Sequence, residues 1–331
     1  MHTGISQPDR ITVTVPARLH LGFLDLNGGL GRQFGSVGLA VSDLKTGLTI
    51  RLAKSAEVSG PETDRVRQYL EIMQRSLALD EAHAVNVAHS VPAHVGLGSG
   101  TQLALAIAAG LRRLHNLPLD IEADALKLGR GARSGIGIGL FRRGGFVVDG
   151  GHGAASAGAP IVSHMTFPDD WRILIVLDPA RRGMHGAEEV AAFARLAPMS
   201  DGEAAHLCRL VLIKALPALA EHDMPSFGAA IRQLQQRLGC YFAPAQGGSP
   251  FTSPAVAAVL ATLEAAGAYG IGQSSWGPTG FAFASSAEEA DRLAVLARRC
   301  THSEGLDIRI CSGLNRGAEV VAHTRCSGQD E

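Results

Sequence analysis

The chain has 331 residues, of which 46% are hydrophobic and 18% are charged, so collagen-like and disordered proteins are excluded. At roughly 150 residues per domain, this length predicts two domains. The 30 basic and 31 acidic side chains leave a net charge of −1, which excludes binding of nucleic acid or an anionic membrane through the overall field.

The first half begins with a β layer, because three short segments are rich in β-branched residues and interrupted by glycine. A surface helix with a 3.6-residue apolar period follows, then an alternating strand closed by Pro92, then a helix that is apolar nearly all round and begins at a glycine loop. A further helix and a glycine-rich turn lead into the next strand. The predicted strands are 11–15, 37–41, 47–52, 84–91 and 145–149; the helices are 62–79, 101–115 and 120–129; the turn starts at 134.

The second half mixes helices and strands in an order that favours antiparallel pairing over a doubly wound sheet. Small residues at 150–160 followed by a buried strand at 172–178 place the junction around 155–170. We therefore expect an α+β protein with domains at 1–165 and 166–331. The predicted helices are 186–196, 202–221, 226–238, 254–266 and 286–300, and the predicted strands are 269–274, 279–284, 306–311 and 318–322.

Neither a secretory signal nor a membrane span is evident. The first thirty residues lack a basic head followed by an apolar run, and no uncharged apolar stretch reaches the ~18 residues that a bilayer span needs. We therefore expect a cytoplasmic protein. Its five cysteines are an odd number without a CxxC pair, which predicts reduced thiols at Cys208, Cys240, Cys300, Cys311 and Cys326.

The strongest chemical signal is the segment 92–102, a strand end followed by a glycine loop and a buried helix. Glycines let backbone N–H groups converge, and the first turn of a helix carries unpaired N–H groups and a partial positive charge. The segment therefore predicts a phosphate site, with Ser99 and Thr101 as added hydroxyl ligands. The alternative is that Ser99 or Thr101 only caps the helix. The residues assigned to the site are Gly96, Gly98, Ser99, Gly100, Thr101 and Gln102.

Together with this loop, the opening segment 16–26 and the late glycine turn 270–280 resemble the three motifs of the GHMP superfamily of small-molecule kinases, in the same order. The resemblance covers nearly the whole chain. It implies an N-terminal domain like ribosomal protein S5 domain 2, a ferredoxin-like C-terminal domain and an active site between them. The motifs PARLHLGFLDL, GLGSGTQ and QSSWGPTGFAF are most similar to the branch of β-ribofuranosylaminobenzene 5′-phosphate synthases.

This branch implies a reaction of phosphoribosyl pyrophosphate with 4-aminobenzoate or 4-hydroxybenzoate, releasing pyrophosphate and CO₂, in tetrahydromethanopterin synthesis. It also implies Mg²⁺ and, for the superfamily, a homodimer. Many GHMP kinases carry a Ser-Gly-Ile-Asp run whose Asp acts as the base, whereas this chain has Gly137 at that place. The kinase Mg²⁺ ligand would fall near Leu126, with Glu122 and Asp124 out of register.

The proposed reaction needs no base on the attacking atom, so it requires anion binding, metal positioning and stacking. Asp25 is the expected carboxylate for Mg²⁺ or a ribose hydroxyl, with Thr101 as a second metal ligand; otherwise Asp25 caps the turn at Asn27. Catalytic roles are assigned to Arg18, Asp25 and Ser275. The remaining substrate contacts are His20, Arg32, Arg130, Arg133, Ser134, Arg182, His185, Ser274, Trp276 and Thr279.

For several of these residues a structural role is the alternative. His20 is equally expected as a buried, hydrogen-bonded histidine, Trp276 as interface packing, and Arg182 and His185 as a solvated loop. Two rival functions also remain, an ATP-dependent GHMP kinase and a noncatalytic ligand-binding member of the fold. Release of CO₂ from the aromatic acid would identify the synthase, and ATP turnover without CO₂ would identify the kinase.

Overall fold

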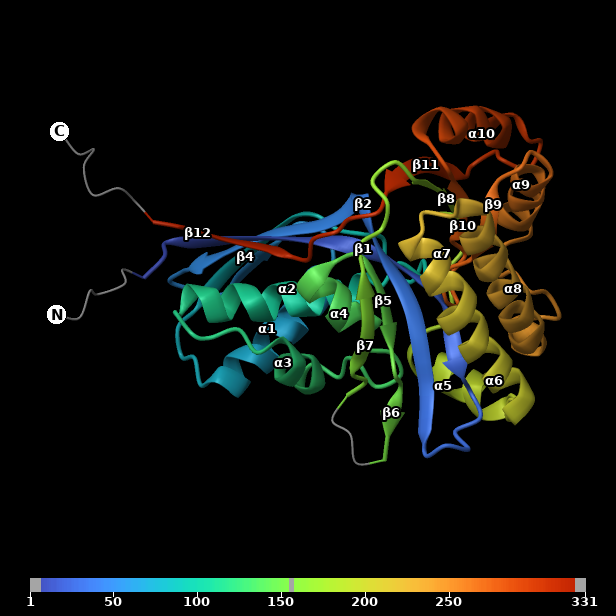
Figure 1. Ribbon diagram of the computed structural model, residues 1–331. Coiled ribbons are helices and arrows are strands. Elements are labelled where there is room, and N and C mark those ends of the chain that lie inside the picture. The colour runs from blue at the N-terminus through green and yellow to red at the C-terminus, as the bar shows by residue number, and fades with distance from the viewer. Residues whose placement is uncertain (1–6, 155–157, 325–331) are drawn as a thin grey trace.

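A computed structural model describes residues 7–154 and 158–324 (Figure 1). The chain forms two sheets with helices packed against them, which confirms the α+β class. The strands are β1 (Arg10–Asp25), β2 (Arg32–Leu52), β3 (Glu57–Ser59), β4 (His83–His89), β5 (Phe146–Asp149), β6 (His152–Gly153), β7 (Ile161–Met165), β8 (Arg172–Leu177), β9 (Tyr269–Gln273), β10 (Gly280–Ala284), β11 (Asp307–Ser312) and β12 (Glu319–His323).

The predicted helices are present within four residues of their expected ends. The helices of the structure are α1 (Thr63–Leu77), α2 (Ser99–Leu114), α3 (Ile121–Lys127), α4 (Ile136–Arg143), α5 (Gly186–Arg195), α6 (Asp201–Leu210), α7 (Leu216–Ala220), α8 (Met224–Phe242), α9 (Pro254–Ala265) and α10 (Ala287–Arg299). A π-helical stretch at Val211–Ala215 joins α6 to α7, and a 3₁₀ turn at Ala243–Gln246 follows α8. In the described ranges, no helix is long and apolar enough to cross a membrane.

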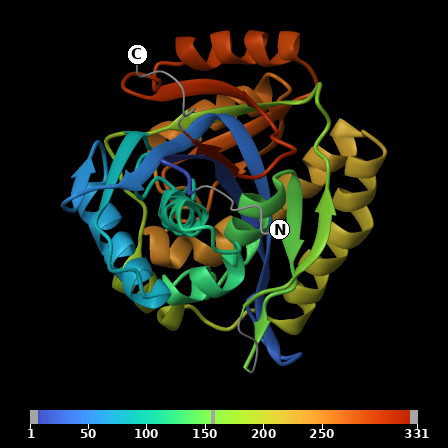
Figure 2. The same ribbon diagram turned by 90° about the vertical axis from the view of Figure 1, so that its left-hand side faces the viewer.

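The first sheet is organised by two long strands, β1 and β2, which pair antiparallel along most of their length. Its order is β12-β1-β2-β4-β3. At the N-terminal end of β2, β5 and β6 pair with β2, and β7 pairs with β5. The helix α2 lies beneath β1, and Figure 2 shows it end-on near the centre of this half. Odd residues of β1, among them Val13 and Leu19, supply the core. A register shift between Pro16 and Ala17 puts Val13 in the core with α2 and Leu19 in the core shared with β8. Arg18 and His20 alternate with Leu19 and point away from that second core.

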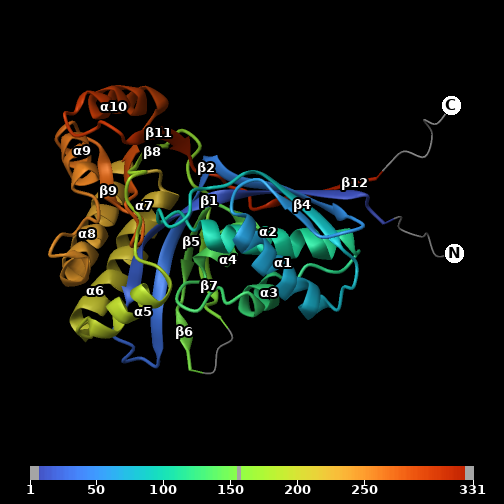
Figure 3. The ribbon, with the colours of Figure 1, turned by 180° about the vertical axis from the view of Figure 1, so that it is seen from behind.

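The second sheet has the order β11-β8-β10-β9, with antiparallel pairing throughout. One face of β8, including Ile173 and Ile175, packs with α8 and with the far ends of β1 and β2 in a core shared by both halves. The other face, including Leu174 and Val176, is covered by α9 and α10. Seen from behind, α5 and α6 lie beside the far ends of β1 and β2 (Figure 3).

The chain changes sheets between β7 and β8, near the predicted junction, but the predicted second domain of 166–331 does not hold to its end. The last strand, β12, returns to the first sheet and pairs with β1, with Ile11 opposite Ala322. Neighbouring strands supply the missing hydrogen-bond partners of an edge strand, and β1 would otherwise be that edge. The described cysteines are free thiols, and Cys326 lies outside the described residues.

The helix α4 was not predicted, because the run Gly135-Ile-Gly-Ile-Gly resembles a turn. Ile136 and Leu140 are fully buried on its inner face, and Gly139 lies against Ile161, where a Cβ would approach Cδ1 to 2.6 Å. The carboxylate of Asp149 accepts the N–H of Gly135 at 2.9 Å at the start of the helix. Burial and this cap stabilise a helix that local propensity disfavours.

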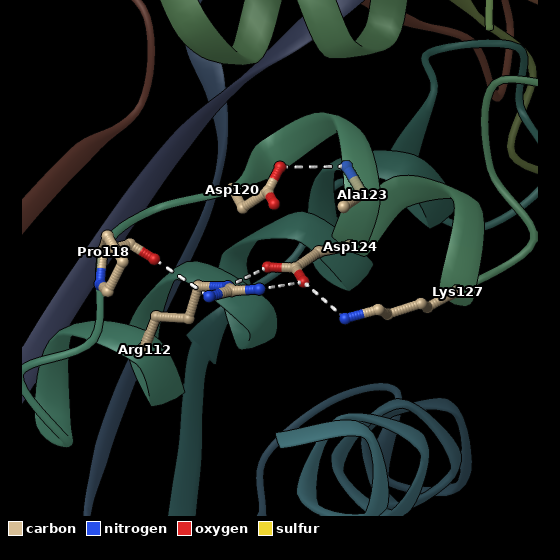
Figure 4. A network of polar contacts seen from close by, with 6 residues as sticks. All are labelled: Arg112, Pro118, Asp120, Ala123, Asp124 and Lys127. Carbon is tan, nitrogen blue, oxygen red and sulfur yellow. Dashed lines mark hydrogen bonds and ion pairs between the residues drawn. The ribbon is translucent and has the colours of Figure 1, made fainter. Parts of the chain in front are cut away.

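Asp124 on α3 belongs to a buried ion pair, not to a metal site. Its carboxylate accepts from Arg112 Nε at 2.5 Å and Nη2 at 2.8 Å, and Lys127 Nζ lies 3.9 Å away (Figure 4). Arg112 also donates to the carbonyl of Pro118 at 2.9 Å. Both oxygens of Asp124 are therefore occupied by the protein, and its side chain is fully buried.

We expect Asp124→Asn to destabilise the fold by about 3 kcal/mol, because it leaves the buried guanidinium of Arg112 without a counter-charge. The matched control is Glu122→Gln, which breaks the Glu122–Arg142 pair; both of its side chains are more than half exposed. That change should shift the free energy of unfolding by less than about 1 kcal/mol. Urea denaturation measures both. Equal losses in the two variants would contradict the assignment.

Candidate active site

The glycine loop reaches α2 through positions that only glycine occupies without strain. Gly96 has φ +89° and Gly98 has φ +71°. A Cβ on Gly96 would clash with the carbonyl oxygen of Ser274, and one on Gly277 would clash with the backbone of Val95. The loop therefore packs backbone to backbone against the late glycine turn, and the two motifs hold each other.

Hydroxyls of the late turn bind this loop. Ser274 Oγ donates to the carbonyl of Gly96 at 2.8 Å and accepts the N–H of His20 at 3.0 Å, and Thr279 Oγ1 donates to the carbonyl of Val95 at 2.6 Å. Both side chains are fully buried. The predicted substrate contacts of Ser274 and Thr279 are therefore corrected: these hydroxyls join the three motifs to one another.

Three arginines surround the start of α2. Arg18 approaches Gly98 so closely that a Cβ there would lie 2.6 Å from both its Cγ and its Nε. Arg65 borders Gly100, and Arg130 Nη1 lies 3.5 Å from where the Cβ of Gly100 would be. Within the described ranges, Arg18 Nε, Arg18 Nη1 and Arg130 Nε are buried without hydrogen-bond partners. Buried guanidinium groups with free donors at a helix N-terminus form an anion site.

Burial lowers the pKa of Arg18 to about 10, although the charges of Glu189 and Asp149 act in the opposite direction. Arg18 is therefore still a cation at neutral pH. Burial, and then the charge of Arg18, hold the pKa of His20 well below its usual range, so this ring is neutral. The site thus presents a positive charge toward the loop and a neutral imidazole two residues further along β1.

A second layer of polar contacts supports the loop from α4 and β5. Asp149 is fully buried, and its carboxylate accepts from Ser36 Oγ at 2.5 Å and from the N–H of Gly151 at 2.9 Å. Ser36 Oγ and Ser134 Oγ share a further hydrogen bond of 2.6 Å. Burial raises the pKa of Asp149, and its hydrogen bonds oppose that shift. The network leaves Asp149 as an anchor for β2, β5 and α4.

The loop before α5 and the first turn of α5 bring a histidine and a carboxylate to the same place. Arg133 Nη2 donates to Glu189 at 2.6 Å, and burial raises the pKa of Glu189 while Arg133 and Arg18 oppose the shift. The rings of His94 and His185 stack with centroids 3.6 Å apart. Arg182 is exposed, and its charge contributes to lowering the pKa of His94. Arg133, Arg182 and His185 therefore gather beside the loop, and their contact with substrate stays a prediction.

Two family descriptions match the chain, GHMP kinases N terminal domain over residues 64–140 and GHMP kinases C terminal over residues 215–298. A homoserine kinase from Cytophaga hutchinsonii has a similar fold, with a TM-score of 0.68 at 17% identity over 96% of this chain and 98% of that one. Phosphomevalonate kinase from Streptococcus pneumoniae also gives a TM-score of 0.68, at 11% identity over 92% and 99% of the two chains. These likenesses establish the fold alone.

Closer relatives carry the name β-ribofuranosylphenol 5′-phosphate synthase. The protein from Archaeoglobus fulgidus is 31% identical over 324 residues, which cover 94% of this chain and 99% of that protein. The one from Methanocaldococcus jannaschii is 34% identical over 255 residues, 67% and 76% of the two chains. The chain belongs to this synthase family. It is therefore an enzyme with the GHMP kinase fold, and the resemblance of its three motifs is confirmed.

The two predicted metal ligands of this synthase family member have different surroundings. Asp25 Oδ1 accepts the N–H groups of Asn27 at 2.8 Å and Gly28 at 2.9 Å, so its carboxylate caps the turn after β1, the alternative considered for it. Thr101 lies on the first turn of α2 beside Gly137. Across the described ranges, no group of three or more His, Cys, Asp or Glu side chains could hold a metal ion.

Other predicted residues of the synthase divide between the site and its frame. Arg32 is exposed and donates to the carbonyls of Gly150 at 2.9 Å and Gly151 at 2.7 Å, so it fixes the β5–β6 turn instead of binding substrate. Gln102 is buried and donates from Nε2 to the carbonyl of Gly137 at 3.1 Å. Ser99, also buried, begins α2 behind Gly98, which has no side chain to cap the helix.

Trp276 and Ser275 lie where the late turn meets the aromatic core. Trp276 is 4% exposed and packs against Phe242, with ring centroids 4.6 Å apart, and against Phe193 at 5.3 Å. Ser275 has φ +55°, and its N–H donates to the carbonyl of His20 at 3.3 Å. Both residues therefore border the same region of β1 as His20.

Sequence reasoning missed Arg65, Asp149, Glu189 and His94. Arg65 lies on the polar side of an amphipathic helix and pairs with Glu62 at 2.9 Å, which is what a surface residue would do. Asp149 ends an apolar strand, where a turn residue is expected. The one available signal was that Asp149 directly follows the apolar residues 146–148, because a carboxylate at the end of a buried strand needs buried partners.

The glycine loop generates a test with a matched control. Gly98→Val should weaken binding of inorganic pyrophosphate by about 100-fold or more, because the new side chain displaces Arg18 from the loop. Gly305→Val places the same residue at a similar φ, +76°, where a Cβ meets nothing within 4 Å. Isothermal titration calorimetry measures both affinities, and circular dichroism reports whether each variant is folded. If Gly98→Val is folded and binds as tightly as Gly305→Val, the anion site lies elsewhere.

Proposed function

We propose that this enzyme transfers the ribosyl 5-phosphate group of phosphoribosyl pyrophosphate to 4-hydroxybenzoate or 4-aminobenzoate, releasing pyrophosphate and CO₂. The observation that carries the proposal is the cluster of Arg18, Arg65 and Arg130 at the start of α2, with buried guanidinium N–H groups left free. The name of the relatives, β-ribofuranosylphenol 5′-phosphate synthase, describes the product that this reaction would give with 4-hydroxybenzoate.

The leaving group explains the need for these cations. As the bond between C1 of the ribose and the pyrophosphate oxygen breaks, negative charge collects on pyrophosphate and C1 becomes oxocarbenium-like. The loop N–H groups and Arg18 stabilise the departing anion in a site that is shielded from water. Electrostatic stabilisation of the leaving group is therefore the main contribution that this chain makes to the barrier.

The acceptor attacks with the ring carbon that bears the carboxylate. A new carbon–carbon bond forms to C1, and the ring becomes cationic with charge shared by the para hydroxyl or amine. The bond to the carboxylate then breaks, CO₂ leaves, and its electron pair restores the aromatic ring. No proton is removed from the attacking atom, so the absence of a carboxylate at Gly137 is consistent with the reaction.

Further parts of the proposal rest on the family resemblance. Mg²⁺, when chelated by the pyrophosphate group, would neutralise charge on the leaving group, and ligands from the substrate suit an ion that keeps few protein ligands. A place in tetrahydromethanopterin synthesis belongs to the same proposal. Homodimerisation and a cytoplasmic location stay predictions.

The reaction can be followed directly. The purified full-length protein with phosphoribosyl pyrophosphate, Mg²⁺ and carboxyl-labelled 4-hydroxybenzoate should release labelled CO₂ and pyrophosphate in equal amounts. Chelation of Mg²⁺ by EDTA should stop both. The control is ATP with the same aromatic acid, which should give no phosphorylated product. ATP turnover without CO₂ release would favour the kinase alternative and remove the proposal.

The base position offers a second test. A Cβ at residue 137 would lie 3.0 Å from Thr101 Cγ2 and 3.7 Å from Arg18 Nε. Gly137→Asp should therefore pair its carboxylate with Arg18, lower the affinity for pyrophosphate by about tenfold and create no kinase activity. Gly137→Asn, which has nearly the same size without the charge, separates crowding from charge. Robust phosphorylation of a hydroxyl by Gly137→Asp would contradict the mechanism.

A further inference from the structure

A small cavity lies between β1, α8 and the late turn. Its volume is about 30 Å³, and its lining includes His20, Phe242, Ser275 and Trp276. A water molecule needs roughly 10–15 Å³ by this measure, so the cavity accommodates the polar end of a ligand, not a whole ring.

Two buried polar atoms at this cavity have no partner. Within the described part of the chain, His20 Nε2 and Trp276 Nε1 make no hydrogen bond, although the residues are only 3% and 4% exposed. Gln235 of the lining is engaged through both ends of its amide: Oε1 accepts the N–H of Gln273 at 2.8 Å, and Nε2 donates to the carbonyl of Leu21 at 2.6 Å. Unpartnered buried groups are rare and mark the place of a missing partner.

The two atoms have opposite hydrogen-bonding roles. An indole Nε1–H can only donate. The ring of His20 is neutral, so one of its two nitrogens is an acceptor, and we assign that role to Nε2, the ring nitrogen without a partner. The cavity therefore offers one donor and one acceptor to a single small group.

We propose that this cavity binds the para hydroxyl of the aromatic acceptor, and that it selects a phenol over an aromatic amine. The proposal rests on the proposed function. A phenol hydroxyl donates to His20 Nε2 and accepts from Trp276 Nε1. The nitrogen of an aromatic amine can donate, but its lone pair is delocalised into the ring and is a poor acceptor, so Trp276 would stay without a partner.

The spacing of Arg18 and His20 along β1 matches the length of the aromatic acceptor. Arg18 and His20 lie on one face of a regular part of β1, two residues or about 7 Å apart, which is the length scale of a para-substituted benzene ring. With the hydroxyl in the cavity, the carbon that bears the carboxylate points toward Arg18 and the glycine loop. Phe23, whose ring centroid is 4.5 Å from that of His20, adds apolar surface for the acceptor.

His20 also favours the transition state over the bound substrate. When the ring carbon attacks, positive charge develops on the para oxygen and its O–H becomes a stronger donor. The hydrogen bond to the neutral Nε2 strengthens at that moment, while the proton stays on oxygen and CO₂ carries away the carboxylate carbon. His20 touches the substrate in this arrangement and is a catalytic residue of the proposal.

The first test compares the two tryptophans of the chain. Trp276→Phe keeps the aromatic packing and removes the donor, so it should lower kcat/KM for 4-hydroxybenzoate by about tenfold and leave the value for 4-aminobenzoate nearly unchanged. Trp171→Phe is the matched control, because Trp171 packs beside Phe227, with ring centroids 5.3 Å apart, and does not line the cavity. It should preserve the ratio of the two acceptors.

The second test uses His20→Phe, which keeps a ring beside Phe23 and removes the acceptor. We expect kcat for 4-hydroxybenzoate to fall by more than tenfold with a smaller change in KM, and pyrophosphate affinity to be retained. Thermal denaturation confirms that each variant is folded. An unchanged kcat in folded His20→Phe overturns the role of His20.

The outcomes separate this inference from the proposed function. If the wild-type enzyme releases CO₂ but Trp276→Phe leaves the acceptor ratio unchanged, the cavity assignment is wrong and the function stands. Binding of labelled 4-hydroxybenzoate in equilibrium dialysis is the readout that needs no turnover. If the wild type forms no product, yet Trp276→Phe weakens that binding and Trp171→Phe does not, the cavity assignment stands and the function falls.

Discussion

The site depends on the contact between two glycine segments that are about 180 residues apart in the chain. Val95 and Gly96 lie against the backbone of Gly277, and two buried hydroxyls, Ser274 and Thr279, close the contact by donating to the loop carbonyls. Because the carbonyls of the loop are bound in this way, its remaining polar groups are N–H donors. The contact thus fixes both the shape and the sign of the anion site.

The charge balance around Arg18 follows from the same arrangement. The loop holds the guanidinium against Gly98, while Asp149 and Glu189 act on it from opposite halves of the protein. Asp149 is anchored by Ser36 and Gly135, and Glu189 is anchored by Arg133. A bound anion would add its charge to this balance and would be neutralised by three cations whose N–H groups are already in place, so little reorganisation is needed.

Periodicity was sufficient to predict most of the fold, because long apolar faces such as those of α2 and β8 leave few alternatives. It failed at α4, where glycines that permit close packing look like turn residues until Asp149 and Ile161 are seen beside them. The same difficulty affected the site. Ser274 and Asp25 carry groups that suit substrate or metal, yet their partners are backbone groups that only the folded chain brings near. Arg65 was missed because it lies on the polar side of a surface helix, and only the folded chain brings it beside Gly100.

The comparison with GHMP kinases suggests how one fold serves two reactions. In the proposed reaction, as in a kinase reaction, a polyphosphate would be held at the start of α2, so the loop itself need not change. What differs is the group that faces the bound ligand. This chain has Gly137 where the kinases place a base, and it closes Asp124 into an ion pair with Arg112. The other side of Arg18 then carries the neutral ring of His20 beside Trp276. A cation flanked by a neutral acceptor and a donor favours an aromatic carboxylate that delivers carbon over a hydroxyl that must lose a proton.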